Sequence, residues 1–278
     1  MIPKVSIIIP VYNHAMYIQQ TLNSIINDSY PSKEIVLIND GSKDNSDAII
    51  QEWIKAHKNT IEVNYLNREN RGLTKTLNEL ITRSSGQYIV ILGSDDYLIN
   101  NTIEGRVRLL EKTPSKLMII GDAIIVDEND NKIYESGLFD FHHGNKASYF
   151  NNSRLKREIV KNWSVVGPVG MVDRKIYDLI GNYDETLFIE DWDFYLRAVA
   201  KDLILFYDAK VAAYRLHSSN TINNPAVLLK MWKSGVETAK KNIKNFGFPY
   251  NFWLFKKYYR ARRKYNALQK EQNANTPH

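Results

Sequence analysis

The first hundred residues alternate short apolar runs with segments of helical spacing, and this rhythm restricts the fold more than any other feature of the chain. The runs with the length of buried strands are Val5–Ile9, Glu34–Ile38, Glu62–Leu66 and Tyr88–Leu92. The segments between them with apolar residues at helical spacing are Met16–Ile26, Ser46–Ala56 and Leu73–Ile81. Strand and helix in this order predict right-handed crossovers and an α/β fold, with a mixed, mostly parallel sheet flanked by helices.

The pattern after residue 100 is less regular. The elements expected there are helices at Ile103–Glu111 and Glu190–Lys201, strands at Leu117–Ile120, Val165–Val172 and Leu203–Tyr207, and a turn at "DENDNK". Residues 139–152, rich in His, Gly, Asn and aromatics without a period, predict a mobile loop. We therefore expect one α/β domain over residues 1–222, in two halves (1–100 and 101–222), and a basic, aromatic, helical tail over 223–278.

Composition excludes several classes of protein. The chain is 44% hydrophobic and 24% charged, which is an ordinary globular balance. It has no cysteine, so a disulfide framework, a thiolate metal site and a cysteine nucleophile are excluded, and a reducing cytosol fits. The apolar run near the N-terminus is short and broken by Pro10, so we expect a first strand there rather than a signal peptide. No apolar stretch approaches the roughly 18 residues of a membrane span.

Polar residues gather where the four expected N-terminal strands end. The segments are "PVYNH", "NDGSKDNS", "NRENRG" and "GSDD". Ligands bind beyond the carboxyl ends of the strands in open α/β sheets. Four polar loops at one edge therefore predict a single binding site.

Asp95 and Asp96 follow a strand that should be buried, and burying paired negative charge without a partner is costly. Aspartate is common in turns and helix caps, but Asn100, Asn101 and Thr102 already supply caps for the next helix. The alternative is a divalent cation, Mg²⁺ or Mn²⁺, that shares phosphate oxygens with a substrate. From the residues alone, both interpretations stay open.

Asp40 in "VLINDGSKDNS" has the same two interpretations. "NDGS" is a strong turn signal and needs no further role. Asp40 would nevertheless lie at the same edge as Asp95, where its carboxylate can accept hydrogen bonds from a base or a ribose.

Four stretches together resemble glycosyltransferase family 2, which has the GT-A fold. They are "VSIIIPVYNH", "EIVLINDGSKDNS", "NRGLTKTLNELITRSSGQYIVILGSDDYL" and "GNYDETLFIEDWDFYLRA", in the family's order and at its usual separations over about residues 4–217. Each is weak alone, and the ordered set is specific. The resemblance implies a sugar transfer from a nucleotide sugar, most often a uridine one, to a hydroxyl of a glycan or lipid-linked acceptor, as in capsule or O-antigen synthesis.

The resemblance also implies roles for donor-side residues. Pro10, Val11, Tyr12 and Asp40 would hold the nucleobase, and Asn70 to Gly72 with Lys75 would lie near the ribose or diphosphate. Asp95 would bind the metal, with Asp96 beside it. The family commonly has "LDSDD" where this chain has "LGSDD", so Gly93 replaces an aspartate, and Ser94 or a water is the candidate substitute for its contact.

"FIEDWDFYLR" supplies three acids at the start of an expected helix, where acids also complement the helix dipole. By the resemblance, Asp191 is the catalytic base, and Glu190 and Asp193 position the acceptor or orient the loop. A base opposite the leaving group implies inversion at the anomeric carbon.

The late motif "YRLHSSNT" is the third contributor to the site. A lone histidine is more often structural, but by the resemblance His217 reaches the metal or diphosphate and Arg215 offsets phosphate charge. Trp163 falls where the acceptor side would be lined, although tryptophan is also ordinary core material.

The tail is strongly basic, with eleven Lys or Arg and one acid between Lys230 and Lys264, against a net charge of +6 for the whole chain. It would pack on the domain as a solvated helix or lie on an anionic membrane, with Trp253, Phe255, Tyr258 and Tyr259 at headgroup level. We expect peripheral contact with the cytoplasmic face of the cell membrane, and no nucleic-acid partner, because no motif for one accompanies the charge.

Rival functions lack their own signatures. A sugar nucleotidyltransferase should carry a glycine-rich loop after the first strand, and a processive synthase should carry membrane spans and Q-x-x-R-W; the sequence has neither. A non-catalytic sugar-nucleotide-binding or scaffolding protein of the same fold remains the alternative, and Gly93 is the feature that favours it.

Overall fold

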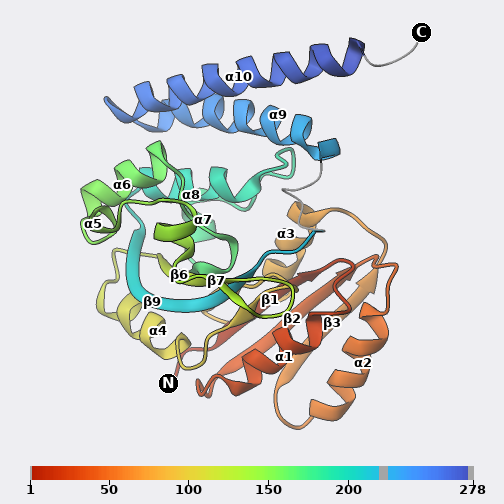
Figure 1. Cartoon of the computed structure of the whole chain (residues 1–278). Helices are drawn as coiled ribbons and strands as arrows, with labels where there is room; N and C mark the ends of the chain where they lie inside the picture. Colours follow the sequence, from red (N-terminus) through yellow and green to blue (C-terminus); the bar gives the residue numbers. More distant parts are fainter. Residues whose placement is uncertain (1, 219–224, 275–278) are drawn as a thin grey trace.

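The computed structural model describes residues 2–218 and 225–274, and the predicted N-terminal strands form one half of its sheet (Figure 1). These strands are β1 (Val5–Val11), β2 (Lys33–Asp40), β3 (Glu62–Arg68) and β4 (Tyr88–Ile91). All their mutual pairings are parallel, in the order β3-β2-β1-β4. The connecting helices are α1 (Ile18–Asn27), α2 (Ser46–His57) and α3 (Leu73–Arg83), so the predicted elements of this half are confirmed.

The unbroken apolar runs of β1 and β2 follow from burial on both faces of the sheet. Ile7 and Ile9 of β1 lie in a cluster with α1 and α2 residues, whereas Ile8 lies in a second cluster with α3 residues. Successive side chains of a strand point to opposite faces. A strand covered on both sides therefore needs apolar residues at every position.

The second half of the sheet mixes strand directions. Its strands are β5 (Tyr97–Leu98), β6 (Met118–Val126), β7 (Lys132–Tyr134), β8 (Gly170–Asp173) and β9 (Ile204–Arg215). β8 lies antiparallel between β4 and β6, and β6 pairs parallel with β9. Over the described residues the nine strands form one sheet. The predicted mixed, mostly parallel sheet is confirmed.

Several sequence predictions in this half were wrong in extent. The strand predicted at 165–172 begins only at Gly170, because Gly167–Val169 forms a 3₁₀ turn around Pro168, which cannot donate to a strand ladder. β9 runs to Arg215, well beyond the predicted end at Tyr207. The short strands β5 and β7 were not predicted, although β7 follows the predicted turn at "DENDNK".

The loop predicted at 139–152 is folded instead. It contains a π-helical turn (Gly137–Phe141) and α5 (Lys146–Tyr149), and α6 (Asn152–Lys161) follows. Leu138 and Tyr149 are buried, and the Tyr149 hydroxyl lies 2.7 Å from Ser164 Oγ. The buried apolar residues that hold this segment are not at helical spacing, so the periodicity of the sequence did not predict its helices.

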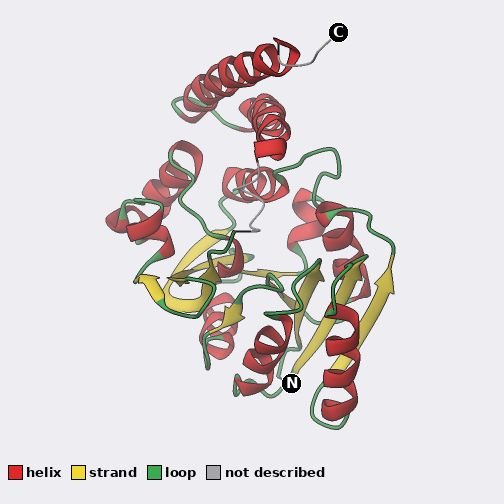
Figure 2. Ribbon diagram, turned by 45° about the vertical axis from the view of Figure 1, so that its right-hand side comes forward, coloured by secondary structure: helices red, strands yellow, loops and turns green. Residues whose placement is uncertain are grey.

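Helices complete the chain, with α4 (Ile103–Lys112) on the α1 and α2 face of the sheet and the others on the opposite side (Figure 1). The others are α7 (Ile176–Ile180), α8 (Glu190–Ala200), α9 (Pro225–Asn242), a 3₁₀ turn (Ile243–Asn245) and α10 (Tyr250–Ala274). α9 and α10 pack against each other and cover α8 and α6 at the top of the molecule (Figures 1 and 2). None of the described helices has the length and apolar content to cross a membrane. The predicted domain boundary at residue 222 lies outside the described residues.

Candidate functional site

Three ligand-type side chains from distant parts of the chain meet beyond the carboxyl ends of β1 and β4. They are His14 after β1, Asp95 after β4 and His217 after β9, and one ligand atom of each lies within 4.8 Å of the others. His217 Nε2 lies 3.0 Å from one carboxylate oxygen of Asp95, and His14 Nδ1 lies 3.7 Å from the other. The structure thus brings the predicted pair Asp95 and His217 together and adds His14.

Sequence reasoning missed His14, although it quoted the loop "PVYNH" that carries it. The signal that could have revealed it was a histidine in a polar loop at the edge of the sheet where the site was predicted. A helix cap would have explained a polar residue there equally well. His14 is held by a 2.7 Å hydrogen bond between its Nδ1 and Ser94 Oγ. Ser94 is 1% exposed, so its hydroxyl positions His14. It does not face the nucleotide-sugar site, as it would have to if it replaced the aspartate that the family has at position 93.

The electrostatics of this cluster suit a divalent cation. Burial lowers the pKa of His14, which keeps the imidazole neutral and able to ligate. Burial alone would raise the pKa of Asp95, but the hydrogen bond with His217 and the nearby His14 bring it below its ordinary value. One carboxylate with two imidazoles is a mixed donor set that fits Mn²⁺ better than Mg²⁺, which prefers oxygen ligands alone.

Asp96 differs from its neighbour. It is buried, accepts a 2.9 Å hydrogen bond from the Arg215 amide, and has a pKa raised by burial and by the charge of Asp95. Its other surroundings include Gly93, where a Cβ atom would lie 2.6 Å from Asp96 Oδ2 and 2.8 Å from Asp95 Oδ1. Glycine at 93 therefore allows both carboxylates to lie over this residue, and an aspartate there would displace them.

The predicted phosphate contact of Arg215 is wrong for the arrangement observed. Its side chain is 1% exposed and donates from Nε to the Asp95 carbonyl (2.9 Å) and from a terminal nitrogen to the Asp127 carbonyl (3.1 Å). It also pairs with Asp130 at 2.8 Å and lies over the Tyr17 ring. In a continuous strand, residues 215 and 217 would point to the same side. Because β9 ends at Arg215, this alternation does not extend to His217, and the two side chains point to different places. Arg215 stabilises the Asp95 turn from behind.

The donor-side prediction for Asp40 also changes. Asp40 is 4% exposed, accepts hydrogen bonds from the amides of Arg71 (2.8 Å) and Gly72 (2.9 Å), and pairs with Arg68. Both carboxylate oxygens of Asp40 accept hydrogen bonds from the "NRENRG" loop, so neither points toward the predicted position of a nucleobase. Asn70 Oδ1 accepts from the Gly72 amide as well, at 3.1 Å.

The remaining donor-side residues divide by burial. Tyr12 is 49% exposed at the edge and Pro10 lines the pocket described below, whereas the Val11 side chain is buried in the core, so only its backbone can meet a nucleotide. Lys75 is exposed on α3 and lines a separate surface hollow with Arg71 and Glu185.

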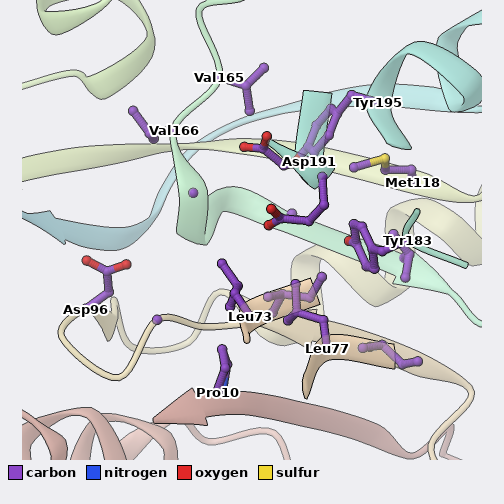
Figure 3. Close-up of a pocket in the computed structure, with 17 residues that line it drawn as sticks. Pro10, Leu73, Leu77, Asp96, Met118, Val165, Val166, Tyr183, Asp191 and Tyr195 are labelled. Atoms are coloured by element: carbon purple, nitrogen blue, oxygen red, sulfur yellow. The ribbon is translucent and has the colours of Figure 1, made fainter. Parts of the chain in front are cut away.

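One pocket joins the Asp95 turn to the start of α8 (Figure 3). Asp96 and Gly93 lie at one end of it, and Glu190 and Asp191 face it from the first turn of α8. Its walls are mainly apolar: Leu73, Leu77, Met118, Val165, Val166, Tyr183 and Tyr195. Burial raises the pKa of Glu190 and of Asp191, and the charge of Asp191 raises that of Glu190 further.

Asp193 does not belong to this pocket. Its side chain is 0% exposed and accepts from Arg197 (2.8 Å), Lys241 (3.1 Å) and Asn242 (2.7 Å). Of the two roles predicted for Asp193, these contacts favour orienting the loop over contacting the acceptor, because the side chain points toward α9 and shares Lys241 with Asp184. Trp163 packs its ring on Tyr195, with centroids 5.1 Å apart, so it supports the pocket wall from behind.

α9 holds the loop that leads to the two pocket carboxylates. Ser234 Oγ accepts hydrogen bonds from the amides of Phe188 (3.0 Å) and Ile189 (2.9 Å), immediately before α8. Lys241 pairs with Asp184 at 2.8 Å in the same loop. The predicted tail is thus part of the framework of the site.

Comparison with known proteins identifies the chain's relatives. The family model described as glycosyl transferase family 2 matches residues 6–180, more than half of the chain. An uncharacterized glycosyltransferase of Rickettsia conorii is 30% identical over 256 residues, which cover 89% of this chain and 41% of the relative. Glycosyltransferase GlyA of Streptococcus pneumoniae serotype 4 is 23% identical, covering 88% and 35%. The chain spans less than half the length of these two relatives.

Solved structures match over nearly the whole chain. S. aureus TarS 1–349 in complex with UDP-GlcNAc has a TM-score of 0.70 at 18% identity, covering 94% of this chain and 73% of that one. Mannosyltransferase PcManGT from Pyrobaculum calidifontis, in complex with GDP-Man and Mn²⁺, has a TM-score of 0.69 at 17% identity, covering 100% and 77%. This chain therefore belongs to glycosyl transferase family 2, the family that its sequence motifs resemble, and has the GT-A fold.

Proposed function

We propose that this protein is an inverting, metal-dependent glycosyltransferase that moves a sugar from a UDP-sugar to a hydroxyl of a glycan or lipid-linked acceptor in surface polysaccharide synthesis. The observation that carries the proposal is one pocket with the cluster of His14, Asp95 and His217 beside one end and the carboxyl groups of Glu190 and Asp191 at the other. Family membership supports the reaction class.

Asp95, His14 and His217 would hold the cation at the donor end. When bound, such an ion supplies Lewis-acid stabilisation of the charge that develops on a departing nucleoside diphosphate. Arg215 and Ser94 keep the Asp95 turn and His14 in place through their hydrogen bonds. Pro10, Tyr12, Asn70, Gly72 and Lys75 remain the predicted contacts for the nucleotide.

Asp191 would take the proton of the acceptor hydroxyl. Its raised pKa makes its carboxylate a stronger base than a free aspartate, and the apolar walls exclude water that would compete with the acceptor. Attack from the Asp191 side, opposite the departing nucleoside diphosphate, would give inversion. Glu190 lies beside it and would orient the acceptor.

Between a hexosyl and an N-acetylhexosaminyl donor we favour the second. Beyond the carboxylates the pocket is lined by Leu77, Met118 and Tyr183, which would accommodate an acetamido methyl better than a hydroxyl. The named neighbours bind UDP-GlcNAc in one case and GDP-Man in the other.

The test is a donor panel of UDP-GlcNAc, UDP-Glc and GDP-Man, each with Mn²⁺, Mg²⁺ or excess chelator, scored by nucleoside diphosphate release. We expect release from UDP-GlcNAc with Mn²⁺ and its loss in chelator. Full release in chelator would refute metal dependence. Tight binding of UDP-GlcNAc without release of nucleoside diphosphate under any condition would support the alternative of a non-catalytic binding protein, which Gly93 favours.

A further inference from the structure

One face of α10 carries aromatic side chains that lie outside both core clusters of the described residues and contact neighbours on the helix itself, such as Phe255 and Tyr259 with ring centroids 4.6 Å apart. Phe252, Phe255 and Tyr259 are 45%, 46% and 53% exposed, and Phe248, just before the helix, is 83% exposed. Phe252, Phe255 and Tyr259 are three and four residues apart, which places them on one face of the helix. Solvent-exposed aromatics in a row are unusual for a soluble surface and mark an interaction site.

The opposite face of α10 already has its partners. Leu254 and Ala261 are buried, and Trp253 and Tyr258 pack against the core cluster. α10 packs along α9 and against α6. The fold therefore does not need the exposed aromatics, which can be changed without opening the core.

Cations surround this aromatic row. No acidic residue occurs between Phe246 and Lys270. Lys256 lies with its Nζ 4.5 Å from the Phe252 ring centroid, and Arg260, Arg263 and Lys270 are exposed on the same or adjoining side. At helical spacing, Arg263 and Lys270 continue the line of Phe252.

We propose that this surface binds an anionic lipid bilayer, with the rings at headgroup level and the cations on lipid phosphates. We call it the docking face: Phe248, Phe252, Phe255, Tyr259, Lys256, Arg260 and Arg263. The inference rests on the membrane contact that the proposed lipid-linked acceptor would require, and it names the surface that makes it. Aromatics with Lys and Arg on one helix face are the composition of interfacial helices.

Charge argues against a second copy of the chain as the occupant. Two docking faces brought together would place uncompensated cations against each other, because no acid lies among them. A bilayer with anionic headgroups supplies the opposite charge along the whole helix.

The docking face is on the side of the molecule that carries the candidate base. α10 is outermost, α9 lies next to it, and α8 with Asp191 follows (Figures 1 and 2). α9 also holds the loop before α8 through Ser234. A bilayer at α10 would thus lie beyond the acceptor end of the pocket, where a lipid-linked hydroxyl would arrive.

Point substitutions are the right test, because removing residues 225–278 would also remove Ser234 from the site framework. The full chain is floated with phosphatidylcholine vesicles with and without phosphatidylglycerol. The aromatic variant combines Phe252→Ser, Phe255→Ser and Tyr259→Ser, and its control is Phe150→Ser, an aromatic that is 57% exposed on the α5–α6 side. The charge variant combines Arg260→Glu and Arg263→Glu, and its control combines the exposed Lys55→Glu and Lys58→Glu of α2.

We expect the unaltered chain to float only with anionic vesicles, and both docking-face variants to lose at least about tenfold in bound fraction while their controls do not. Thermal shift by Mn²⁺ and UDP, measured in parallel, should be the same in all variants, which separates failure of docking from failure of the proposed activity. No flotation of the unaltered chain, or flotation unchanged in both variants, would overturn the proposal. A dimer in solution that the aromatic variant dissociates would assign the face to a second copy and overturn it as well.

Discussion

Asp96 lines one end of the pocket, with Asp95 beside it, and Glu190 and Asp191 line the other end; the two pairs have different partners. Asp95 has two imidazoles within 4 Å of its oxygens, and its pKa is lowered. Asp191 has the Trp192 amide at 2.6 Å and apolar walls, and its pKa is raised. The pKa of an aspartate is thus lowered beside the two imidazoles and raised between apolar walls, which supports the proposed roles of Asp95 as a metal ligand and Asp191 as a base.

The largest effect should come from removing the base. Asp191→Asn keeps the shape of the side chain and removes its proton affinity, so we expect transfer to fall about 10²- to 10⁴-fold. UDP affinity in Mn²⁺ should be unchanged, because the metal end is intact. Transfer rate and calorimetric UDP binding measure the two quantities. The control is Asp208→Asn, an exposed acid of β9; an active Asp191→Asn enzyme would reassign the base.

At the metal end, His14→Gln should lower Mn²⁺ affinity by roughly 10- to 100-fold, because it removes one of the three ligand-type groups. Transfer should recover at high Mn²⁺, in contrast to Asp191→Asn. Titration of Mn²⁺ by electron paramagnetic resonance gives the affinity. His57→Gln is the matched control, since His57 stacks on Trp53 of α2 and lies outside the cluster. Equal affinity in the two variants would remove His14 from the site.

A smaller effect concerns pH. Asp191 must be ionised to act as a base, so activity falls as pH drops through its pKa, and burial raises that pKa to about 6. The acidic limb of kcat/KM should therefore lie well above the range of a free aspartate. Glu190→Gln should leave the limb nearly unchanged, because burial and the charge of Asp191 raise the pKa of Glu190 to about 8, so Glu190 is still protonated and neutral where Asp191 titrates. A limb near 4 in the unaltered chain would be inconsistent with a buried base.

The sequence predicted the N-terminal half of the fold well because both faces of β1 and β2 are covered, which forces continuous apolar runs. β8 was harder, since four residues inserted antiparallel between β4 and β6 have no local signature. The curled end of β9 was missed because its pairing with β6 shifts register near Asp122.

The candidate site was predictable where a residue follows a strand directly, as Asp95 does. Three acids at the start of α8 could not be told apart from sequence, because only packing shows that Asp193 faces Lys241 while Asp191 faces the pocket. Asp40 and Arg215 were placed correctly at the edge, but their partners come from the chain itself. Hydrogen bonds between distant loops leave no trace in local spacing.

The hydroxyl of Ser234 recognises main-chain amides at positions 188 and 189, so the attachment is indifferent to which side chains those positions carry. The side chains of this loop can therefore change one at a time during evolution while the hydrogen bonds to the Ser234 hydroxyl are kept. Libraries that randomise the exposed positions 186 and 188 on a fixed Ser234 background should yield many folded proteins in which the choice of the proposed acceptor can be altered.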